Sequence, residues 1–340
     1  MPTPAGSVPP SSHGPRLLAA RGACTRNWCG DGARRGEPLL NAPAWAAVVV
    51  NYNAGPLLEA CVRSILADDS AGDPEVVVVD NGSVDGSADA LEAAGLPARV
   101  VRAPGNVGYA AAANLGTAST TAPVVAVMNP DTVVRPGTAA AVLAAFGHAP
   151  DVAAVGPRIR NTDGTVYPSA RMFPSTLDAV GHGLLFLVWR RNPFTRRYRQ
   201  LDADFDAARE VDWVSGAAVW LRREAVDAIG GWDEGYFMYV EDVDLCWRLR
   251  RAGWKVWFEP AGEVEHVQGT ATGRTPYRML ARHHRSLLRF AAKRWRGPRR
   301  VLLAPAAGFL AVRALLSMLH HLVVRRWRPQ GVSGPPRPNG

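Results

Sequence analysis

Cysteine is scarce in this sequence, with four residues among 340. Cys61 and Cys246 fall within apolar helical patterns, where we expect reduced, buried thiols, and this usage indicates a reducing compartment. Cys24 and Cys29 are spaced C-x4-C without a second pair or a nearby group of histidines, so we do not expect a metal site there. The length and the 47% hydrophobic content suffice for one large domain, or two smaller ones, with a real core.

Acidic residues are absent from the last 74 positions, which carry 15 Lys and Arg, whereas the first 266 carry 24 basic and 30 acidic residues. An acidic body with a basic tail predicts contact with a polyanion, either phospholipid or nucleic acid. No recognised nucleic-acid-binding motif occurs, and the basic residues accompany a long apolar segment rather than interleaved aromatics. These features favour a membrane surface and no nucleic acid. A nucleic-acid-binding protein is the alternative that is not an enzyme.

Residues 1–43 also lack the apolar run of a secretory signal peptide. Prolines lie there among Ser, Gly and Arg, a composition expected of a disordered leader or of sequence upstream of the true start. We expect residues 44–268 to form the main domain. Residues 269–328 are expected to form basic and apolar helices that associate with a membrane, and residues 329–340 a disordered tail.

From Trp45 onward, short apolar runs alternate with helical periodicity. The apolar runs at 46–53, 75–83, 99–106 and 124–131 predict buried strands, and helices are expected at 57–66 and from Tyr109. Strands and helices that alternate with short connections predict an α/β fold, with a mostly parallel sheet covered on both faces. Ligands of such sheets bind at the carboxyl ends of the strands.

Polar residues follow all four of these predicted strands. They are Asn51, Tyr52, Asn53, Asp80, Asn81, Ser83, Asn106, Gly108, Asn129 and Asp131. Any one of these turns is explained by the preference of Asn, Asp and Gly for strand ends, but four together predict one polar crevice. Neither G-x-G-x-x-G nor G-x-x-x-x-G-K-[ST] occurs, so the chain has no dinucleotide fingerprint and no P-loop. A nucleotide bound here would need another partner for its phosphates, most simply a divalent cation.

Asp131, in MNPDT, is the candidate cation ligand, because an acid at the tip of a buried strand can offer oxygens to Mg²⁺ or Mn²⁺. A bound diphosphate would fill other coordination positions. His266, in EVEHVQG, is a second candidate, although a lone histidine is more often a packing or surface residue.

The segment YFMYVEDVDLCWRLRRAGW (236–254) has three carboxylates within four residues, Glu241, Asp242 and Asp244. Helical periodicity places Asp242 near the apolar residues Cys246 and Leu249. Partial desolvation there would raise its pKa toward that of a working base. Acids in the first turn and arginines in the last also match compensation of the helix dipole. The residues alone leave these two explanations about equal.

The ordered set of motifs resembles the family 2 glycosyltransferases of the GT-A fold, in their rhamnosyltransferase-like branch. The matching segments are VVVNYN, VVDNGSVDGS, PGNVGYAAAANLG, MNPDT, WVSGAAVWLRREAVDAIGGWDEGYFMYVEDVDLCWRLRRAGW and EH. They span roughly residues 45–268, and the ordered set is far more specific than any one member. The resemblance implies a Rossmann-like, mostly parallel sheet with helices on both faces, and a nucleotide-sugar donor.

The resemblance also implies a role for each site residue. On the donor side, Asp80 would lie near the base and Asn51 and Asn53 near the nucleoside, with Asn81, Asn106, Gly108 and Asn129 completing the pocket. Asp131 would be the metal-binding acid of the family's D-x-D motif, and His266 a further ligand. Asn129 stands where many members have the first Asp of that motif. Asp242 would be the general base, and Glu241, Trp213, Ser215 and Gly216 would shape the sugar and acceptor pockets.

The reaction implied by the resemblance is an inverting, metal-dependent sugar transfer in one displacement. The motifs are most similar to those of enzymes that move L-rhamnose from dTDP-rhamnose onto N-acetylglucosaminyl-diphospho-polyprenol, a lipid-linked diphosphate sugar used in cell-wall arabinogalactan linker synthesis. Use of another nucleotide sugar for polysaccharide or glycolipid synthesis is the alternative. No Ser/His arrangement suggests a covalent intermediate.

The basic residues of the tail recur at helical spacing, at Arg274, Arg278, Arg282, Arg285, Arg289, Lys293, Arg296 and Arg300. They predict one amphipathic stripe on an anionic membrane if the helix continues past Gly297 and Pro298. Residues 301–324 are long enough to span a bilayer, but their Pro, Arg and His residues favour the interface. We therefore expect peripheral attachment to the cytoplasmic face of the plasma membrane. Residues 183–199 mix apolar and basic residues, as in a second membrane contact or a lid near the acceptor.

Overall fold

The computed structural model describes residues 44–173, 175–186, 189–267 and 276–326. The expected leader and C-terminal tail lie outside these residues. Four strands form where the apolar runs predicted them, although each ends before its run does: β1 (Trp45–Asn51), β2 (Glu75–Asp80), β3 (Ala98–Arg102) and β4 (Val124–Met128). The polar residues after each run are therefore free to form the loops of a site.

The main sheet has the strand order β3-β2-β1-β4-β11-β6-β12-β5. β1 pairs in parallel with β2 and β4, and β2 with β3, which confirms the parallel arrangement predicted for these four strands. β11 (Ala218–Arg222) then runs antiparallel to both β4 and β6 (Val152–Asn161). The sheet is therefore mixed beyond β4.

β12 (Lys255–His266) connects distant parts of the chain. It runs parallel to β6 and antiparallel to the short β5 (Thr132–Val134), so that His266 pairs with Thr132. This pairing brings the end of the predicted domain back beside the loop that follows β4.

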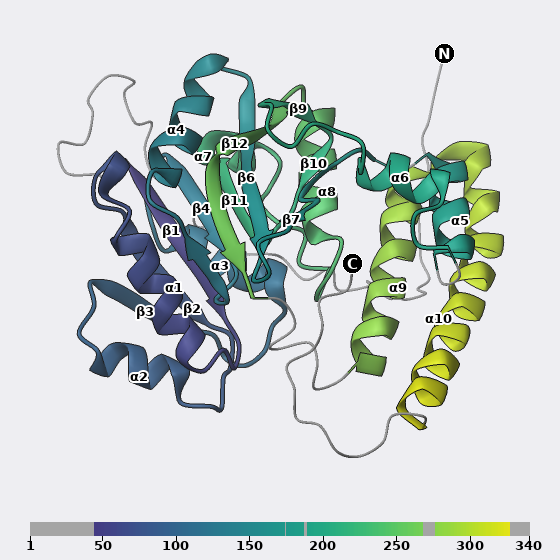
Figure 1. Cartoon of the computed structure of the whole chain (residues 1–340), viewed down its shortest axis with the longest axis horizontal. Coiled ribbons are helices and arrows are strands. Elements are labelled where there is room, and N and C mark those ends of the chain that lie inside the picture. Colours follow the sequence, from purple (N-terminus) through teal and green to yellow (C-terminus); the bar gives the residue numbers. More distant parts are fainter. Residues whose placement is uncertain (1–43, 174, 187–188, 268–275, 327–340) are drawn as a thin grey trace, which may run out of the picture. The chain divides into compact units, whose positions relative to one another are not determined.

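Helices cover both faces of the sheet, as predicted (Figure 1). Alternate residues along β1 enter opposite cores: Val48 and Val50 belong to one, Ala47 and Val49 to the other. One core includes residues of α3 (Tyr109–Ala118), α7 (Arg223–Ala228) and α8 (Glu241–Arg251), and the other residues of α1 (Pro56–Leu66), α2 (Ser87–Ala93) and α4 (Thr138–His148). The shorter elements are η1 (Asp69–Ala71), β7 (Val166–Tyr167), β8 (Ala170–Arg171), β9 (Arg209–Val211) and β10 (Trp213–Val214).

Cys61 in α1 and Cys246 in α8 are buried free thiols, as expected. Burial raises the pKa of each to about 12, so both stay protonated at neutral pH. They act as small apolar side chains of the two cores.

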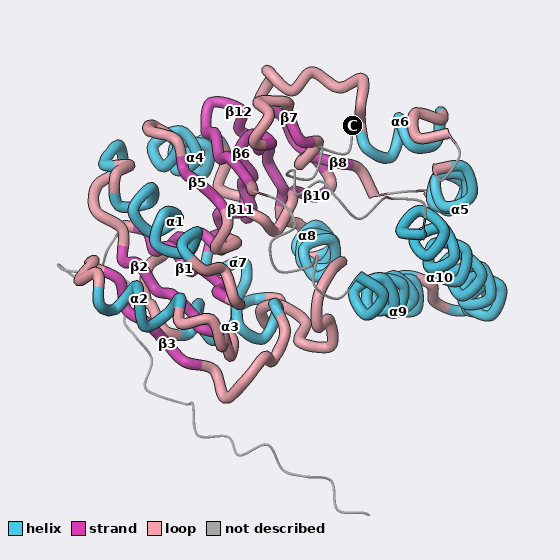
Figure 2. The backbone as a smooth tube through the Cα atoms, turned by 60° about the horizontal axis from the view of Figure 1, so that its bottom comes forward, coloured by secondary structure: helices cyan, strands magenta, loops and turns pink. Residues whose placement is uncertain are grey.

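α9 (Pro276–Arg294) and α10 (Leu303–Arg326) lie side by side, joined by the short helix η2 (Gly297–Leu302) (Figure 2). The condition for one continuous basic stripe is not met, because α9 ends at Arg294, Gly297 adopts a left-handed φ of 57°, and a proline follows it. Among the described residues, no helix combines the length and apolarity that crossing a bilayer requires. Residues 183–199 fall largely in α5 (Thr176–Leu185) and α6 (Pro193–Arg199), which pack against each other.

The basic stripe of α9 is also not wholly exposed. Arg289 lies 2.9 Å from Asp233, and Lys293 lies 2.7 Å from Asp244. Part of the predicted membrane-facing charge is therefore neutralised within the protein, by acids that are distant in sequence.

Candidate active site

The loops after β1 and β2 are joined by one buried amide. Nδ2 of Asn51, whose side chain is fully buried, lies within donating distance of Asp80 Oδ1 (3.2 Å), Ser83 Oγ (3.1 Å) and Ser87 Oγ (2.9 Å). Asn53 adopts a left-handed φ of 53°, and its side chain accepts a bond from Val84 N. These two asparagines therefore shape the loops, while the Asp80 carboxylate marks the end of β2.

The loop after β3 is held in the same way. Asn81 Oδ1 accepts a bond from Val107 N at 2.9 Å, and Asn106 Oδ1 accepts one from Gly108 N at 3.2 Å. Gly108 has a φ of 92°, and a Cβ there would lie 2.7 Å from the carbonyl oxygen of Phe237. Only glycine allows this approach, which joins the predicted donor side to the segment that leads into α8.

The two predicted metal ligands meet, although 135 residues separate them. His266 Nε2 lies 3.1 Å from Asp131 Oδ1 and 3.2 Å from Asn129 Nδ2. His266 Nδ1 is buried without a hydrogen-bond partner in the described part of the chain. One carboxylate and one imidazole fit a divalent cation that accepts both oxygen and nitrogen ligands, and Mn²⁺ meets that demand better than Mg²⁺. No third His, Cys, Asp or Glu joins them among the described residues.

Two of the clustered acids lie at the start of α8. Asp242 is partly exposed, and its Oδ2 accepts a bond from Gly216 N at 2.9 Å. Glu241 is buried, and its Oε2 has no hydrogen-bond partner within the described ranges. Burial raises the pKa of both carboxyls; the Asp242 charge raises that of Glu241 further, whereas the bond from Gly216 partly offsets the rise at Asp242. A carboxyl with a raised pKa beside a solvent-accessible space is suited to proton transfer.

The backbone just before these acids is strained. Tyr239 and Val240 have φ values of 68° and 70°, a left-handed conformation that is unfavourable for a β-branched residue such as Val240. Val240 and Tyr236 pack against Phe290 of α9, which holds the segment in place. Strained backbone persists only where the surrounding structure maintains it, and such residues are concentrated at functional sites.

Tyr109 joins the metal side of the site to the α8 side. Its hydroxyl donates to the carbonyl oxygen of Gly216 at 2.7 Å, the same residue whose amide contacts Asp242. Burial raises the pKa of Tyr109 well above its usual value, and the charges of Glu241, Asp242 and Asp131 raise it further. The charges of three carboxylates therefore act on this one buried phenol.

The segment predicted to shape the sugar pocket runs through this site. Asn129 N donates to Ala217 O at 2.9 Å, so the segment touches the metal side as well. Trp213 is buried, and its Nε1 donates to Met172 O at 3.2 Å; Ser215 Oγ accepts from Ala217 N. Gly216 thus faces the site through its backbone, while Trp213 and Ser215 make internal contacts.

Comparison with known proteins identifies the family. Residues 43–287 match the model of the family described as "Glycosyltransferase like family 2". The chain belongs to this family. Over 294 residues, covering 82% of this chain and 92% of the relative, it is 40% identical to the N-acetylglucosaminyl-diphospho-decaprenol L-rhamnosyltransferase of Mycobacterium tuberculosis (strain ATCC 25618 / H37Rv). It is a glycosyltransferase.

Two solved structures resemble the glycosyltransferase in fold. One is GalNAc-T7 with UDP, GalNAc and Mn²⁺, with a TM-score of 0.54 and 17% identity over 77% of this chain and 49% of that one. The other is the mannosyltransferase PcManGT from Pyrobaculum calidifontis with GDP-Man and Mn²⁺, with a TM-score of 0.53 and 18% identity over 85% and 82%. The fold of the chain is GT-A, as predicted.

The third acid of the α8 cluster has a different environment in the glycosyltransferase. Asp244 is completely buried and bonds to Arg248 Nε (2.7 Å), Lys293 Nζ (2.7 Å) and the Tyr236 hydroxyl (3.2 Å). It ties α8 to α9. α8 also has its acids in the first turn and its arginines in the last, an arrangement that compensates the helix dipole.

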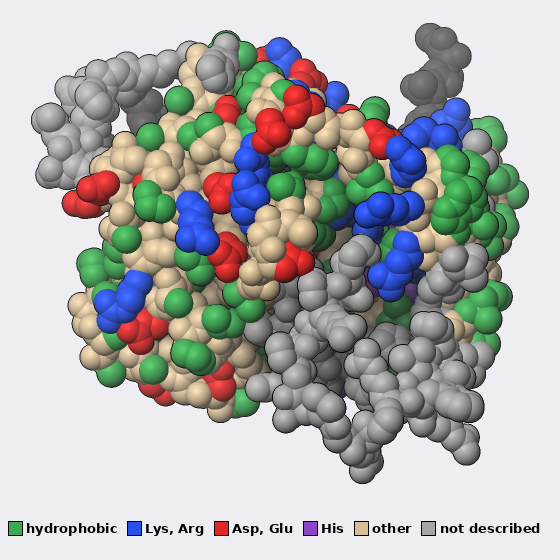
Figure 3. Space-filling view, in the orientation of Figure 1, with side chains coloured by type: hydrophobic (Ala, Val, Ile, Leu, Met, Phe, Trp, Pro, Cys, Tyr) green, Lys and Arg blue, Asp and Glu red, His purple; other side chains and the backbone are tan. Residues whose placement is uncertain are grey.

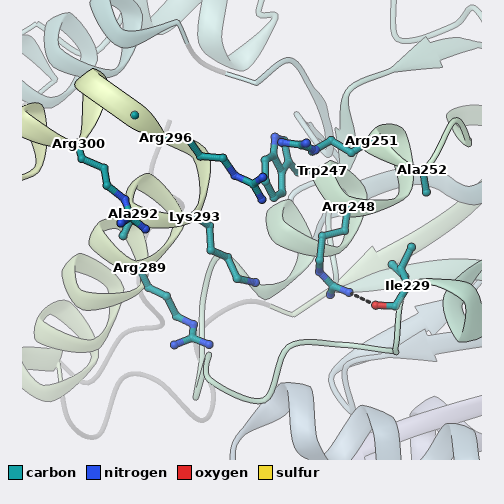
Figure 4. Close-up of a pocket in the computed structure, with 11 residues that line it drawn as sticks. Ile229, Trp247, Arg248, Arg251, Ala252, Arg289, Ala292, Lys293, Arg296 and Arg300 are labelled. Atoms are coloured by element: carbon teal, nitrogen blue, oxygen red, sulfur yellow. Dashed lines mark hydrogen bonds between the residues drawn. The ribbon is translucent and has the colours of Figure 1, made fainter.

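A basic cavity lies at the opposite end of α8 from Asp242 (Figure 4). Its volume is about 1050 Å³, and its charged lining consists of Arg248, Arg251, Arg289, Lys293, Arg296 and Arg300. Arg248 donates to Ile229 O, and Arg251 lies over the ring of Trp247. Arg296 and Arg300 extend the cavity toward η2 and the exposed apolar residues that follow.

Proposed function

We propose that the enzyme transfers L-rhamnose from dTDP-rhamnose, with inversion, to a polyprenyl-diphosphate-linked N-acetylglucosamine during cell-wall arabinogalactan linker synthesis. The observation that carries a transfer reaction is that the Asp131–His266 pair and Asp242 are linked through one segment, since Asn129 bonds to Ala217 and Asp242 to the preceding Gly216. The sugar and the acceptor are supported by the name of the 40% identical relative, because the alignment covers 92% of that relative.

Asp242 acts as the general base in this proposal. It accepts the proton of the acceptor hydroxyl while that oxygen bonds to the anomeric carbon, and the bond from that carbon to the diphosphate oxygen breaks on the opposite face. Gly216 N orients the carboxylate, and the raised pKa of Asp242 strengthens it as a base. Glu241 lies beside it on the acceptor side.

Asp131 and His266 would hold a divalent cation, Mg²⁺ or Mn²⁺, which supplies charge stabilisation to the departing diphosphate. Both solved structures of similar fold contain Mn²⁺. On the donor side, Asp80 binds near the base, and the amides of Asn51 and Asn81 hold the loops that form the pocket. Asn53, Asn106, Gly108 and Asn129 complete its wall.

A donor panel tests the proposal. The purified full chain is incubated with Mg²⁺ or Mn²⁺, a short-chain N-acetylglucosaminyl-diphospho-polyprenol and one donor: dTDP-rhamnose, UDP-galactose, UDP-glucose or GDP-mannose. The mass of the lipid product is then measured by mass spectrometry. We expect a gain of one deoxyhexose with dTDP-rhamnose alone, abolished by EDTA. Gain of a hexose would overturn the rhamnose assignment and support another donor. Activity in EDTA would overturn the proposed requirement for a divalent cation.

Peripheral attachment to the cytoplasmic membrane face is part of the proposal. It is supported by the cationic cavity beside α9 and by exposed apolar residues on η2 and α10: Val301, Leu302, Val312, Leu315 and Leu316. We expect the full chain to float with anionic vesicles at physiological salt and not with neutral ones. Retention on DNA without vesicle binding would favour the nucleic-acid alternative.

A further inference from the structure

Arg171 of β8 is a buried cation without an ion-pair partner. It is 8% exposed, and no carboxylate oxygen lies within 4 Å of its nitrogens in the described part of the chain. Its Nε donates to Pro168 O at 2.7 Å and its Nη2 to the Tyr167 hydroxyl at 2.9 Å. Its guanidinium also lies 5.0 Å from the ring centre of Trp213, the residue that begins the segment leading to Gly216.

Arg199, at the end of α6, is a second cation of this kind. Its guanidinium lies 4.9 Å from the ring centre of Phe186, and its Nε is buried without a hydrogen-bond partner among the described residues. Burial lowers the pKa of Arg199, and the nearby charge of Arg171 lowers it further. No carboxylate within the described ranges forms an ion pair with Arg199.

Aromatic rings and one histidine connect the two arginines. The Tyr198 ring lies 5.8 Å from the Arg171 guanidinium and 5.1 Å from the ring of His182, which in turn lies 4.8 Å from Phe186. Burial lowers the pKa of His182 to about 4, and the charges of Arg199, Arg313 and Arg171 contribute, so its imidazole is neutral at neutral pH. The cluster thus brings two guanidinium groups to one group of rings, and in the part of the chain that the structure describes neither has a carboxylate within ion-pair distance.

Arg199 lacks a nearby compensating anion among the described residues, whereas the charge of Asp242 acts on Arg171. Contacts with aromatic rings stabilise a guanidinium only modestly, whereas a desolvated charge is costly unless it is paired. Planar guanidinium groups match phosphate oxygens in geometry and charge. Arg171 pairs across β8 and β10 with Trp213, three residues before Gly216, whose amide donates to Asp242 at 2.9 Å. An anion held by Arg171 would therefore lie on the side of the proposed base.

We propose that Arg171 and Arg199 bind the diphosphate of the lipid-linked acceptor and thereby present its sugar to Asp242. The assignment rests on the proposed function, because it supplies the acceptor site of that reaction. Leu184 and Trp189 are exposed beside α6 and offer an apolar path for the start of the lipid chain. Figure 3 shows Lys and Arg side chains gathered over the α6 region, with apolar side chains on the adjacent outer edge.

Two acceptors and two variants test this site. One acceptor carries N-acetylglucosamine on a short polyprenyl diphosphate, and the other carries it on the same lipid through a neutral linker. We expect Arg199→Gln to lower kcat/KM about 10- to 100-fold for the diphosphate acceptor only, because it removes charge-assisted hydrogen bonds. The matched control is Arg196→Gln, an exposed arginine of the same helix that pairs with Asp202, and it should change neither value. Equal losses on both acceptors, or no loss, would overturn the proposal.

Direct binding separates this inference from the proposed function. Farnesyl diphosphate is titrated into the full chain by calorimetry in EDTA, which removes any contribution from a cation at Asp131. We expect binding by the wild type, weakened about 10-fold or more in Arg199→Gln and unchanged in Arg196→Gln. If no donor is transferred but this pattern holds, the proposed reaction fails and the anion site stands. If sugar is transferred while Arg199→Gln binds farnesyl diphosphate as the wild type does, the site assignment fails alone.

Discussion

The two sides of the active site differ in what their buried polar groups do. On the donor side, the amides of Asn51 and Asn81 bond to neighbouring loops, and these bonds set the shape of the crevice. On the acceptor side, the polar groups are acids, Glu241 and Asp242, whose pKa values are raised by burial. Both sides contain a buried oxygen without a partner among the described residues, Asn51 Oδ1 and Glu241 Oε2, but only the second belongs to a group that can exchange a proton. Substitutions on the two sides should therefore fail differently.

The largest effect is expected on the acceptor side, from Asp242→Asn. We expect kcat to fall about 100- to 10,000-fold, because the amide cannot take the proton of the acceptor. The unfolding temperature should fall by no more than the loss of one hydrogen bond causes, because the amide can accept from only one of Gly216 N and Val243 N. Glu224→Gln, at an exposed acid of α7, is the control and should retain wild-type turnover. Full turnover by Asp242→Asn would remove the base assignment.

The next largest effect is expected on stability, and it distinguishes the role of Asp244 from that of Asp242 on the same helix. Asp244→Ala should destabilise the fold by about 3 to 5 kcal/mol, because it removes the fully buried carboxylate that pairs with both Arg248 and Lys293 and leaves these two cations without it. Chemical denaturation measures this loss. The double variant Asp244→Ala, Lys293→Met should lose less than the two single changes together. A stable Asp244→Ala protein with low kcat would instead give Asp244 a catalytic role.

Sequence patterns alone could not distinguish Asp242 from Asp244. Both lie in the first turn of one predicted helix, and the partner that makes Asp244 structural, Lys293, is 49 residues away. The same limit applies to the basic stripe of α9, whose acidic partners lie outside the tail. Local charge spacing predicts which residues share a helix face, but not what that face packs against.

The parallel strands and the polar loops that follow them were predictable, because apolar runs and the turn residues after them are local signals. Asp131 and His266 were each identifiable as candidates. Their meeting depends on antiparallel pairing of β5 with β12, which no local pattern encodes. Arg171 gave no signal, because its strand has two residues and its burial depends on contact with Trp213, which is distant in sequence.

A smaller effect is expected on the donor side, from Asn51→Ala. The change removes a buried donor shared by Asp80, Ser83 and Ser87 and should destabilise the fold by about 1 to 3 kcal/mol. We expect a higher KM for the donor, with kcat changed less than in Asp242→Asn. Val84→Ala, at a side chain that is 90% exposed in the same turn, should change neither. Loss of kcat alone would contradict a scaffold role.

The smallest expected effect is a shift in the pH dependence of kcat and of stability, caused by the acids of the acceptor side. Because burial raises the pKa of Asp242, the acid limb of log kcat should lie at higher pH than an ordinary aspartate would place it. The free energy of unfolding should fall as pH rises from the ordinary carboxyl pKa through the raised values, since the folded protein keeps these protons longer than the unfolded chain. Glu241→Gln decides which carboxyl is responsible. A limb that persists in this variant belongs to Asp242, whereas a limb that disappears makes Glu241 the titrating group and moves the base by one residue.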